Sequence, residues 1–127
     1  ICLEVFAPMV RTMRVRTERL REAAGAGFIN ATDAADYLVR QGIPFRDAYT
    51  AVGRLVAACT ERNVTLEELP LEEWQRIHPA FGADIYDAIS LDACVNGRRV
   101  PGGPAEECVR AQIEDMEHFV KTAREEK

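Results

Sequence analysis

Two histidines carry the side chains most often used for acid–base chemistry near neutral pH. His78 directly precedes Pro79 at an expected helix break, and His118 lies among charged residues on an expected solvated helix face. Because neither has a persuasive partner, a surface or helix-capping role is favoured over catalysis. The single serine, Ser90, stands next to Leu91 at an expected helix cap. No nucleophile–base pair is visible, so the residues alone do not indicate a self-sufficient enzyme.

Neighbouring carboxylates could serve as acid–base pairs or as metal ligands. The candidates are Glu67-Glu68, Glu72-Glu73, and Asp84 with Asp87. Adjacent residues on a helix point in different directions, and glutamates in a first helical turn already interact with the helix dipole. An ordinary helix start is therefore favoured, and no metal-binding residue is predicted.

The four cysteines, Cys2, Cys59, Cys94 and Cys108, form no C-x-x-C pair, so a zinc site has little support. Each stands among apolar neighbours on an expected helix. A free cysteine in such a place behaves as a small buried hydrophobe, and this interpretation is favoured over a disulfide. Since no secretory signal is visible, the reducing cytoplasm is the expected compartment.

Arg98-Arg99, followed by Gly102-Gly103 before an expected helix start, has the parts of an anion site. Backbone N–H groups and cationic side chains would converge there. The fuller glycine spacing of a phosphate loop is missing, however. A loop that needs flexible backbone is therefore favoured, and no cofactor-binding residue is predicted.

Length and composition narrow the function classes further. A chain of 127 residues, 47% hydrophobic and 29% charged, is typical of one small globular unit. The formal charge of −5 argues against a nucleic-acid surface. No apolar run approaches the roughly 20 residues of a transmembrane helix. The residues after Ile1 already resemble a helix interior without a cap, which predicts a piece cut from a longer chain.

The stretch Ala31 to Ala48 combines a helix start, a helix stop and a second helix start. Thr32 is expected to cap the first helix, and Asp33 places negative charge at the positive end of its dipole. Gly42 suits the left-handed position after a helix end, and Pro44 suits the first turn of the next helix. Two helices joined in this way must turn sharply against each other.

A helix-turn-helix outline could suggest DNA reading, with the second helix in the major groove. That helix carries Phe45, Tyr49 and Val52 near its start, and Asp47 stands beside Arg46. This surface is typical of packing, so DNA binding is not favoured.

The other elements follow from apolar spacing and stop signals. A first helix with Pro8 inside its apolar stripe, which predicts a kink or the real helix start, ends before the Gly-Ala-Gly run at 25–27. Further helices are expected from 44 to about 62, from the Thr65–Glu68 capping box to Pro70, over 71–77 and 81–89, and from Glu106 onward. The residues expected to face inward include Ala35, Leu38, Val39, Phe45, Ala48, Val52, Leu55, Val56 and Cys59, and the final helix has the stripe Val109, Ile113, Met116 and Val120. No window alternates apolar and polar residues, so the predicted fold class is all-α, with a small domain of about five to seven helices.

The block Ala31–Ala48 closely resembles the C-terminal region of the argininosuccinate lyase family, where the run usually reads ATDLADYLV, one or two linking residues, then G-V-P-F-R. The agreement continues in order on both sides of the block. It includes Met13-Arg14-Val15, Thr17-Glu18-Arg19, Gly27-Phe28, Val52-Gly53, Leu69 to Ile77, Pro79, Phe81, Asp84-Ile85-Tyr86 and Gly102-Gly103. One departure is His78, where the family more often has a serine.

The resemblance implies a parent enzyme that cleaves argininosuccinate to arginine and fumarate by β-elimination, without a metal or organic cofactor. The family's base is a serine in a mobile Gly-Ser-Ser loop that continues to a lysine. This chain has no Ser-Ser pair and no lysine before Lys121. No catalytic residue is therefore assigned here, and the isolated chain is expected to be inactive.

The resemblance also predicts an organisation and partners. Residues 1–24 would be either the end of a helix continuing from a missing central helical domain or a connecting helix, and residues 25–127 would be the C-terminal helical domain. The expected partners are the rest of the parent lyase, its homotetramer and its substrate, with neither nucleic acid nor membrane. The alternative is a stand-alone helical module that binds a partner protein through exposed apolar stripes.

Overall fold

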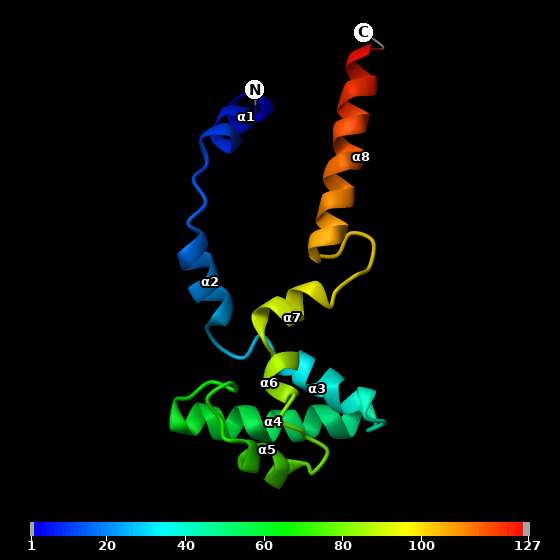
Figure 1. Cartoon of the computed structure of the whole chain (residues 1–127). Coiled ribbons are helices and arrows are strands. Elements are labelled where there is room, and N and C mark those ends of the chain that lie inside the picture. The colour runs from blue at the N-terminus through cyan, green and yellow to red at the C-terminus, as the bar shows by residue number, and fades with distance from the viewer. Residues whose placement is uncertain (1, 126–127) are drawn as a thin grey trace.

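The computed structural model describes residues 2–125, in which there are eight helices and no strand, so the all-α fold class is confirmed. Figure 1 shows a folded body, a short connecting helix and two arms. The body consists of α3 (Ala31–Arg40), α4 (Phe45–Arg62), α5 (Leu71–Ile77) and α6 (Ile85–Ala88). The connecting helix is α7 (Leu91–Asn96), the N-terminal arm is α1 (Cys2–Thr12) with α2 (Thr17–Gly25), and the C-terminal arm is α8 (Glu106–Glu125).

The core of the body is built around Trp74 of α5, which has no exposed surface. Its ring meets Phe81 edge-on with the centroids 4.9 Å apart, and Tyr86 edge-on at 6.5 Å. The indole Nε1 is buried and has no hydrogen-bond partner in residues 2–125. Around these rings pack Leu38, Leu55, Leu66, Leu69, Ile85 and Ile89, all at most 2% exposed. Replacing a large core residue of this kind with alanine typically costs about 3–5 kcal/mol.

The turn between α3 and α4 has the predicted geometry at Gly42, whose φ is +88°. The Ile43 N–H donates to Leu38 O at 3.1 Å, and the Gly42 N–H donates to Val39 O at 2.9 Å. This pair of bonds is the Schellman motif, which satisfies carbonyls that the helix end leaves unpaired. A second left-handed residue, Asn63 at φ 52°, ends α4.

Two helix-start residues in this region lie at other positions than predicted: Thr32, which was predicted as a cap, and Pro44, which was predicted in a first turn. The helix α3 begins at Ala31 because Asn30 O accepts the first helical bond, from Ala34 N at 3.1 Å, so Thr32 lies inside the first turn. Pro44 likewise stands at the N-cap position of α4, one residue before the helix, where its carbonyl accepts from Asp47 N at 2.9 Å and Ala48 N at 3.0 Å.

The segment between α4 and α5 contains a capping box without a helix. Thr65 N donates to Glu68 Oε2 at 2.8 Å, as the pattern predicts, whereas Thr65 Oγ1, which a complete capping box would use as an acceptor, donates to the same oxygen at 3.2 Å. Pro70 ends the segment before helical bonds form, and residues 65–69 remain turns and bends. The predicted short helix is therefore wrong.

Helix α6 is shorter than predicted, with four residues in place of the expected 81–89. Phe81 is 1% exposed and anchors the preceding loop in the core. The Tyr37 hydroxyl then holds the loop, because it accepts from Gly82 N at 3.1 Å and donates to Asp84 Oδ1 at 2.8 Å. Ser90 caps α7 as predicted, accepting from Ala93 N at 3.3 Å.

The N-terminal arm was predicted as one helix and consists of two, separated by residues 13–16, with Pro8 inside α1. Neither α1 nor α2 nor α8 contains a buried residue. The predicted apolar stripe of α8 is exposed. In the body, Val39 is 38% and Phe45 56% exposed, which also contradicts their predicted inward positions. The remaining predicted core residues of α3 and α4 are buried or partly buried.

Candidate functional site

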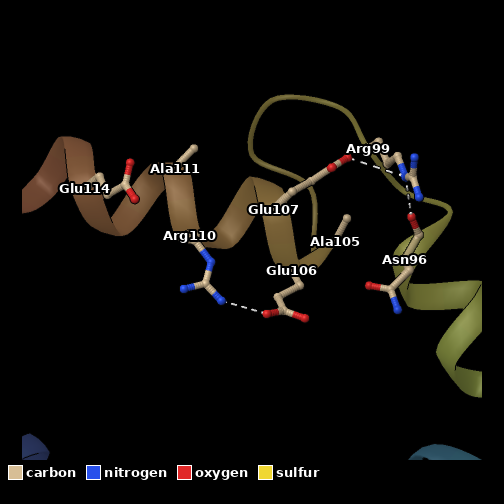
Figure 2. Close-up of a pocket in the computed structure, with 8 residues that line it drawn as sticks. All are labelled: Asn96, Arg99, Ala105, Glu106, Glu107, Arg110, Ala111 and Glu114. Carbon is tan, nitrogen blue, oxygen red and sulfur yellow. Dashed lines mark hydrogen bonds and ion pairs between the residues drawn. The ribbon is translucent and has the colours of Figure 1, made fainter.

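The candidate anion site of the sequence lies where α7 leads into α8, and Figure 2 shows the pocket there. Its volume is about 400 Å³. The lining consists of Asn96 and Arg99 after α7, and of Ala105, Glu106, Glu107, Arg110, Ala111 and Glu114 at the start of α8. Three carboxylates and two guanidinium groups therefore share one open, polar hollow.

Each arginine of the pocket is paired with a carboxylate (Figure 2). Arg99 Nε lies 3.4 Å from Glu107 Oε1 and donates to Asn96 O at 3.1 Å. Arg110 Nη2 lies 2.7 Å from Glu106 Oε1. These pairs are exposed, so each contributes little to stability, but they offset the positive charge that an anion would need.

Arg98 is not among the residues that line this pocket, and its partners lie on α3 and α7. Its Nη2 lies 3.0 Å from Asp33 Oδ2, and its Nη1 donates to the carbonyl of Cys94. The hydrogen bond to Asp33 raises the pKa of Arg98 above its ordinary value. The two adjacent arginines thus bind different carboxylates and do not converge on one ligand.

The glycines of the loop serve the turn. Gly102 has φ +81°, and a Cβ on Gly103 would collide with the backbone oxygens of Arg98 and Val100. The Gly103 N–H donates to Val100 O at 2.7 Å. These two positions therefore require glycine for the backbone of the loop, which agrees with the predicted need for flexible backbone there.

The two histidines lie on different elements, and within residues 2–125 no hydrogen bond joins either imidazole to a serine or a cysteine. His78 Nδ1 accepts from Ala80 N at 3.2 Å, and its ring meets Phe81 edge-on, so this half-buried side chain orders the turn after α5. His118 is exposed on α8, where its carbonyl accepts from Thr122 Oγ1 at 3.1 Å. A capping role is shown for His78 and a surface position for His118.

Four of the carboxylates that resembled metal ligands have structural partners. Glu67 accepts from Asn30, Glu68 from Thr65, and Asp84 from Tyr37. Glu73 Oε2 lies 2.6 Å from Arg76 Nη2 and 3.5 Å from Arg62 Nη2. Within residues 2–125, no three side chains of His, Cys, Asp or Glu are grouped closely enough to hold a metal ion.

The cysteines are all free thiols with different surroundings. Cys59 and Cys94 are buried, as predicted, whereas Cys108 is half-buried and Cys2 is exposed on an arm that the body does not cover. Burial raises the pKa of the Cys94 thiol to about 11, and burial also raises the pKa of Cys59. Both buried thiols therefore stay protonated and unreactive near neutral pH.

Sequence reasoning missed one buried polar residue. Asn30 is 4% exposed, and its Nδ2 donates to Glu67 Oε1 at 2.7 Å and to Ile89 O at 3.1 Å. It joins the start of α3 to two segments distant in sequence. No local pattern marks it, since both partners are more than 30 residues away.

No helix in the described part of the chain combines the length and apolar character needed to cross a membrane.

Comparisons with known proteins identify relatives of this chain. The sequence model described as "Argininosuccinate lyase C-terminal" matches residues 28–96, more than half of the chain. This chain belongs to the argininosuccinate lyase family.

Individual argininosuccinate lyases match well beyond that segment. The lyase of Clostridium beijerinckii is 46% identical over 125 residues, which are 98% of this chain and 27% of the relative. Those of Heliobacterium mobile and Geobacter sp. strain M21 are 50% identical over 113 residues and 54% over 112, covering 89% and 88% of this chain. The chain spans about a quarter of the length of these lyases.

The family model and the individual lyases match different lengths of this chain. The matched segment 28–96 covers the body and α7, which hold the whole of the buried apolar cluster. The Clostridium beijerinckii match, at 98% of the chain, extends into both arms. Both the body and the arms are therefore argininosuccinate lyase sequence.

Proposed function

We propose that this chain is the C-terminal portion of an argininosuccinate lyase whose complete form cleaves argininosuccinate to arginine and fumarate by β-elimination in arginine biosynthesis. One observation carries this proposal. The chain is 46–50% identical in sequence, over 89–98% of its length, to lyases of which the match covers only 25–27%. The cytoplasm, a homotetramer and the rest of the lyase are the proposed compartment and partners.

In this proposal the chain supplies no catalytic, cofactor-binding or metal-binding residue. The only serine, Ser90, is occupied as the cap of α7. The buried thiols stay protonated, and the arginines around the pocket of Figure 2 are paired with carboxylates. The described side chains thus offer a scaffold, and the base that removes the substrate proton belongs to another part of the enzyme.

The proposed division into residues 1–24 and 25–127 is supported by the absence of buried residues in α1 and α2. Six helices follow Gly25 in the described residues, and four of them enclose the aromatic core. Residues 1–24 would then belong to the preceding domain or connect it to the body, with α1 and α2 as two separate helices.

A chimaera tests the proposal. The last quarter of the Geobacter lyase is replaced by this chain, and fumarate release from argininosuccinate is measured by ultraviolet absorbance. We expect activity within about tenfold of the parent lyase, since the catalytic loop stays in the retained part. The 127-residue chain alone is expected to release none. Fumarate from the chain alone, or a folded but inactive chimaera, would contradict the proposal.

The alternative, a stand-alone helical module that binds a partner protein, is favoured by one observation: the large apolar side chains exposed on α1 and α8. The reading frame upstream of Ile1 separates the two. A Gly-Ser-Ser loop and a long helical bundle encoded there support the lyase, and their absence supports the module.

A further inference from the structure

Asn96, the last residue of α7, is the one asparagine of the chain that directly precedes a glycine. Its side chain is exposed, and within residues 2–125 no hydrogen bond holds its amide group, although its backbone oxygen accepts from Arg99 Nε at 3.1 Å (Figure 2). The next residue, Gly97, has no side chain that would crowd its backbone nitrogen. An asparagine amide is one of the chemically labile groups of proteins, and this neighbour leaves it open to attack.

The other two asparagines lie in surroundings that oppose such an attack. Asn30 is 4% exposed, and its amide is held by two hydrogen bonds inside the body. Asn63 is exposed, but the branched side chain of Val64 crowds the backbone nitrogen that follows it, and that N–H is itself hydrogen-bonded at 3.1 Å. Asn96 is therefore the asparagine whose side-chain carbonyl carbon the following nitrogen reaches most freely.

The folded end of α7 restrains this reaction. The Gly97 N–H donates to Ala93 O at 2.8 Å, so the proton that must leave before the nitrogen attacks is held in a helical hydrogen bond. Side chains of a helix tilt toward its N-terminus, which directs the Asn96 side chain away from Gly97 N. Helix α7 has six residues and depends on the Ser90 cap at its start. A short, exposed helix of this kind opens locally more readily than a core element.

We propose that Asn96 is a site of spontaneous deamidation, to which opening of the last turn of α7 gives access. Gly97 N loses its proton and attacks Asn96 Cγ. The new C–N bond closes a succinimide ring, and the side-chain nitrogen leaves as ammonia. Water then adds to one of the two ring carbonyls. If the bond from Gly97 N to Cγ breaks, the product is aspartate. If the bond from Gly97 N to the backbone carbonyl carbon breaks, the main chain runs through the former side chain, and the product is isoaspartate.

Either product changes the junction between α7 and α8. A carboxylate at position 96 joins a pocket that Glu106, Glu107 and Glu114 already line, so like charges face each other. Isoaspartate also lengthens the main chain by one atom, at the residue whose carbonyl accepts from Arg99 Nε. The loop that leads to α8 should therefore open, while the body stays folded. The reaction does not depend on the lyase activity.

Peptide mapping by mass spectrometry tests the site. The 127-residue chain is kept at mildly alkaline pH, folded or in guanidinium chloride, and then cut with trypsin, which places the three asparagines in the separate peptides 22–40, 63–76 and 77–98. Peptide 77–98 should gain mass first, by the difference between an oxygen atom and an N–H group, and about tenfold or more faster in guanidinium chloride. A sample digested without incubation gives the background. No gain in this peptide, a faster gain in either other peptide, or equal rates in the folded and unfolded chain would overturn the proposal.

Substitutions separate the chemistry from the fold. Asn96→Gln keeps an exposed amide but requires a larger, less favourable ring, so peptide 77–98 should stay unmodified. Asn63→Gly, which suits the left-handed backbone at that position, is the control and should leave the reaction at Asn96 unchanged. Ser90→Ala removes the cap of α7 and should speed the reaction about threefold or more in the folded chain, but not in guanidinium chloride. A wild-type rate in folded Ser90→Ala would show that α7 does not control access, contrary to the proposal.

Hydrogen exchange measured by NMR tests the effect on the junction. The Gly103 N–H, which donates to Val100 O at 2.7 Å, should exchange about threefold or more faster in the chain that carries isoaspartate. Asn96→Asp adds the charge without the extra main-chain atom and should change this rate less. Unchanged exchange at Gly103 in the isoaspartate chain would refute the proposed opening of the loop.

Discussion

Asn30 and Glu67 form a hydrogen bond of 2.7 Å between the start of α3 and the turn after α4. The same Asn30 amide reaches the carbonyl of Ile89, so one buried side chain joins three segments of the body. A buried polar group of this kind is costly when it loses its partners, and its removal leaves the other groups unsatisfied.

Asn30→Ala is expected to lower the free energy of unfolding by about 1–3 kcal/mol, because Ile89 O and Glu67 lose their shared donor. Urea denaturation measures the change. Asn96→Ala, at an exposed position, is the control and should stay within about 0.5 kcal/mol of wild type. Equal effects of the two substitutions would show that the Asn30 bonds contribute nothing.

Gly42→Ala and Gly53→Ala should change stability in opposite directions. Gly42 has φ +88°, so alanine is strained there and should cost about 1 kcal/mol or more. Gly53 is exposed inside α4 with no atom within 4 Å of an added Cβ, so alanine should stabilise by about 0.5–1 kcal/mol. Melting temperatures compare the two, and a stabilising Gly42→Ala would refute the left-handed turn.

Tyr37→Phe removes the hydroxyl that both accepts from Gly82 N and donates to Asp84. We expect a loss of about 1 kcal/mol in the free energy of unfolding, with the loop before α6 becoming more open to hydrogen exchange. Tyr49→Phe, at an exposed tyrosine of α4, is the control and should leave stability nearly unchanged. Unaltered exchange at Gly82 in Tyr37→Phe would contradict the assigned role.

The Cys94 thiol should make stability depend on pH in alkaline solution. Burial raises its pKa from 9.0 to about 11, so the folded state favours the protonated thiol. The contribution of the protonated Cys94 thiol to the free energy of unfolding is fully present below pH 9 and is lost as the pH rises toward and past 11. Cys94→Ala should flatten the fall in the free energy of unfolding across this range, while Cys2→Ala, at an exposed thiol, should not. The same slope in Cys94→Ala as in wild type would contradict the burial effect.

Features that depend on a few neighbouring residues were predictable from the sequence. The left-handed Gly42, the Ser90 cap, the end of α4 at Arg62 and the loop glycines at 102–103 all follow from local backbone chemistry. The Thr65–Glu68 bond also formed as its pattern predicts, but Pro70 prevented the helix. Local signals therefore fix turns more reliably than they fix the helices beside them.

Features that depend on distant residues were not predictable. The helix start at Asn30 was not predicted, because the hydrogen-bond partners of its side chain, Glu67 and Ile89, are distant in sequence. Arg98 was grouped with its neighbour Arg99, although it binds Asp33. The apolar stripe of α8 was predicted without the surface that covers it, since amphipathic spacing shows that a helix face is to be covered but not by which chain. The family resemblance, which rests on order along the whole sequence, identified what no single residue did.

Trp74 gives the body an optical signal of its own. It is the only tryptophan of the chain, fully enclosed by Phe81 and Tyr86, and it lies in α5, whereas the arms contain none. Its fluorescence should therefore be emitted at short wavelength while the body is folded and shift to longer wavelength only when that core opens. A substitution in either arm that leaves this core closed should leave the emission unchanged, so one spectrum can tell loss of the folded body from a change elsewhere in the chain.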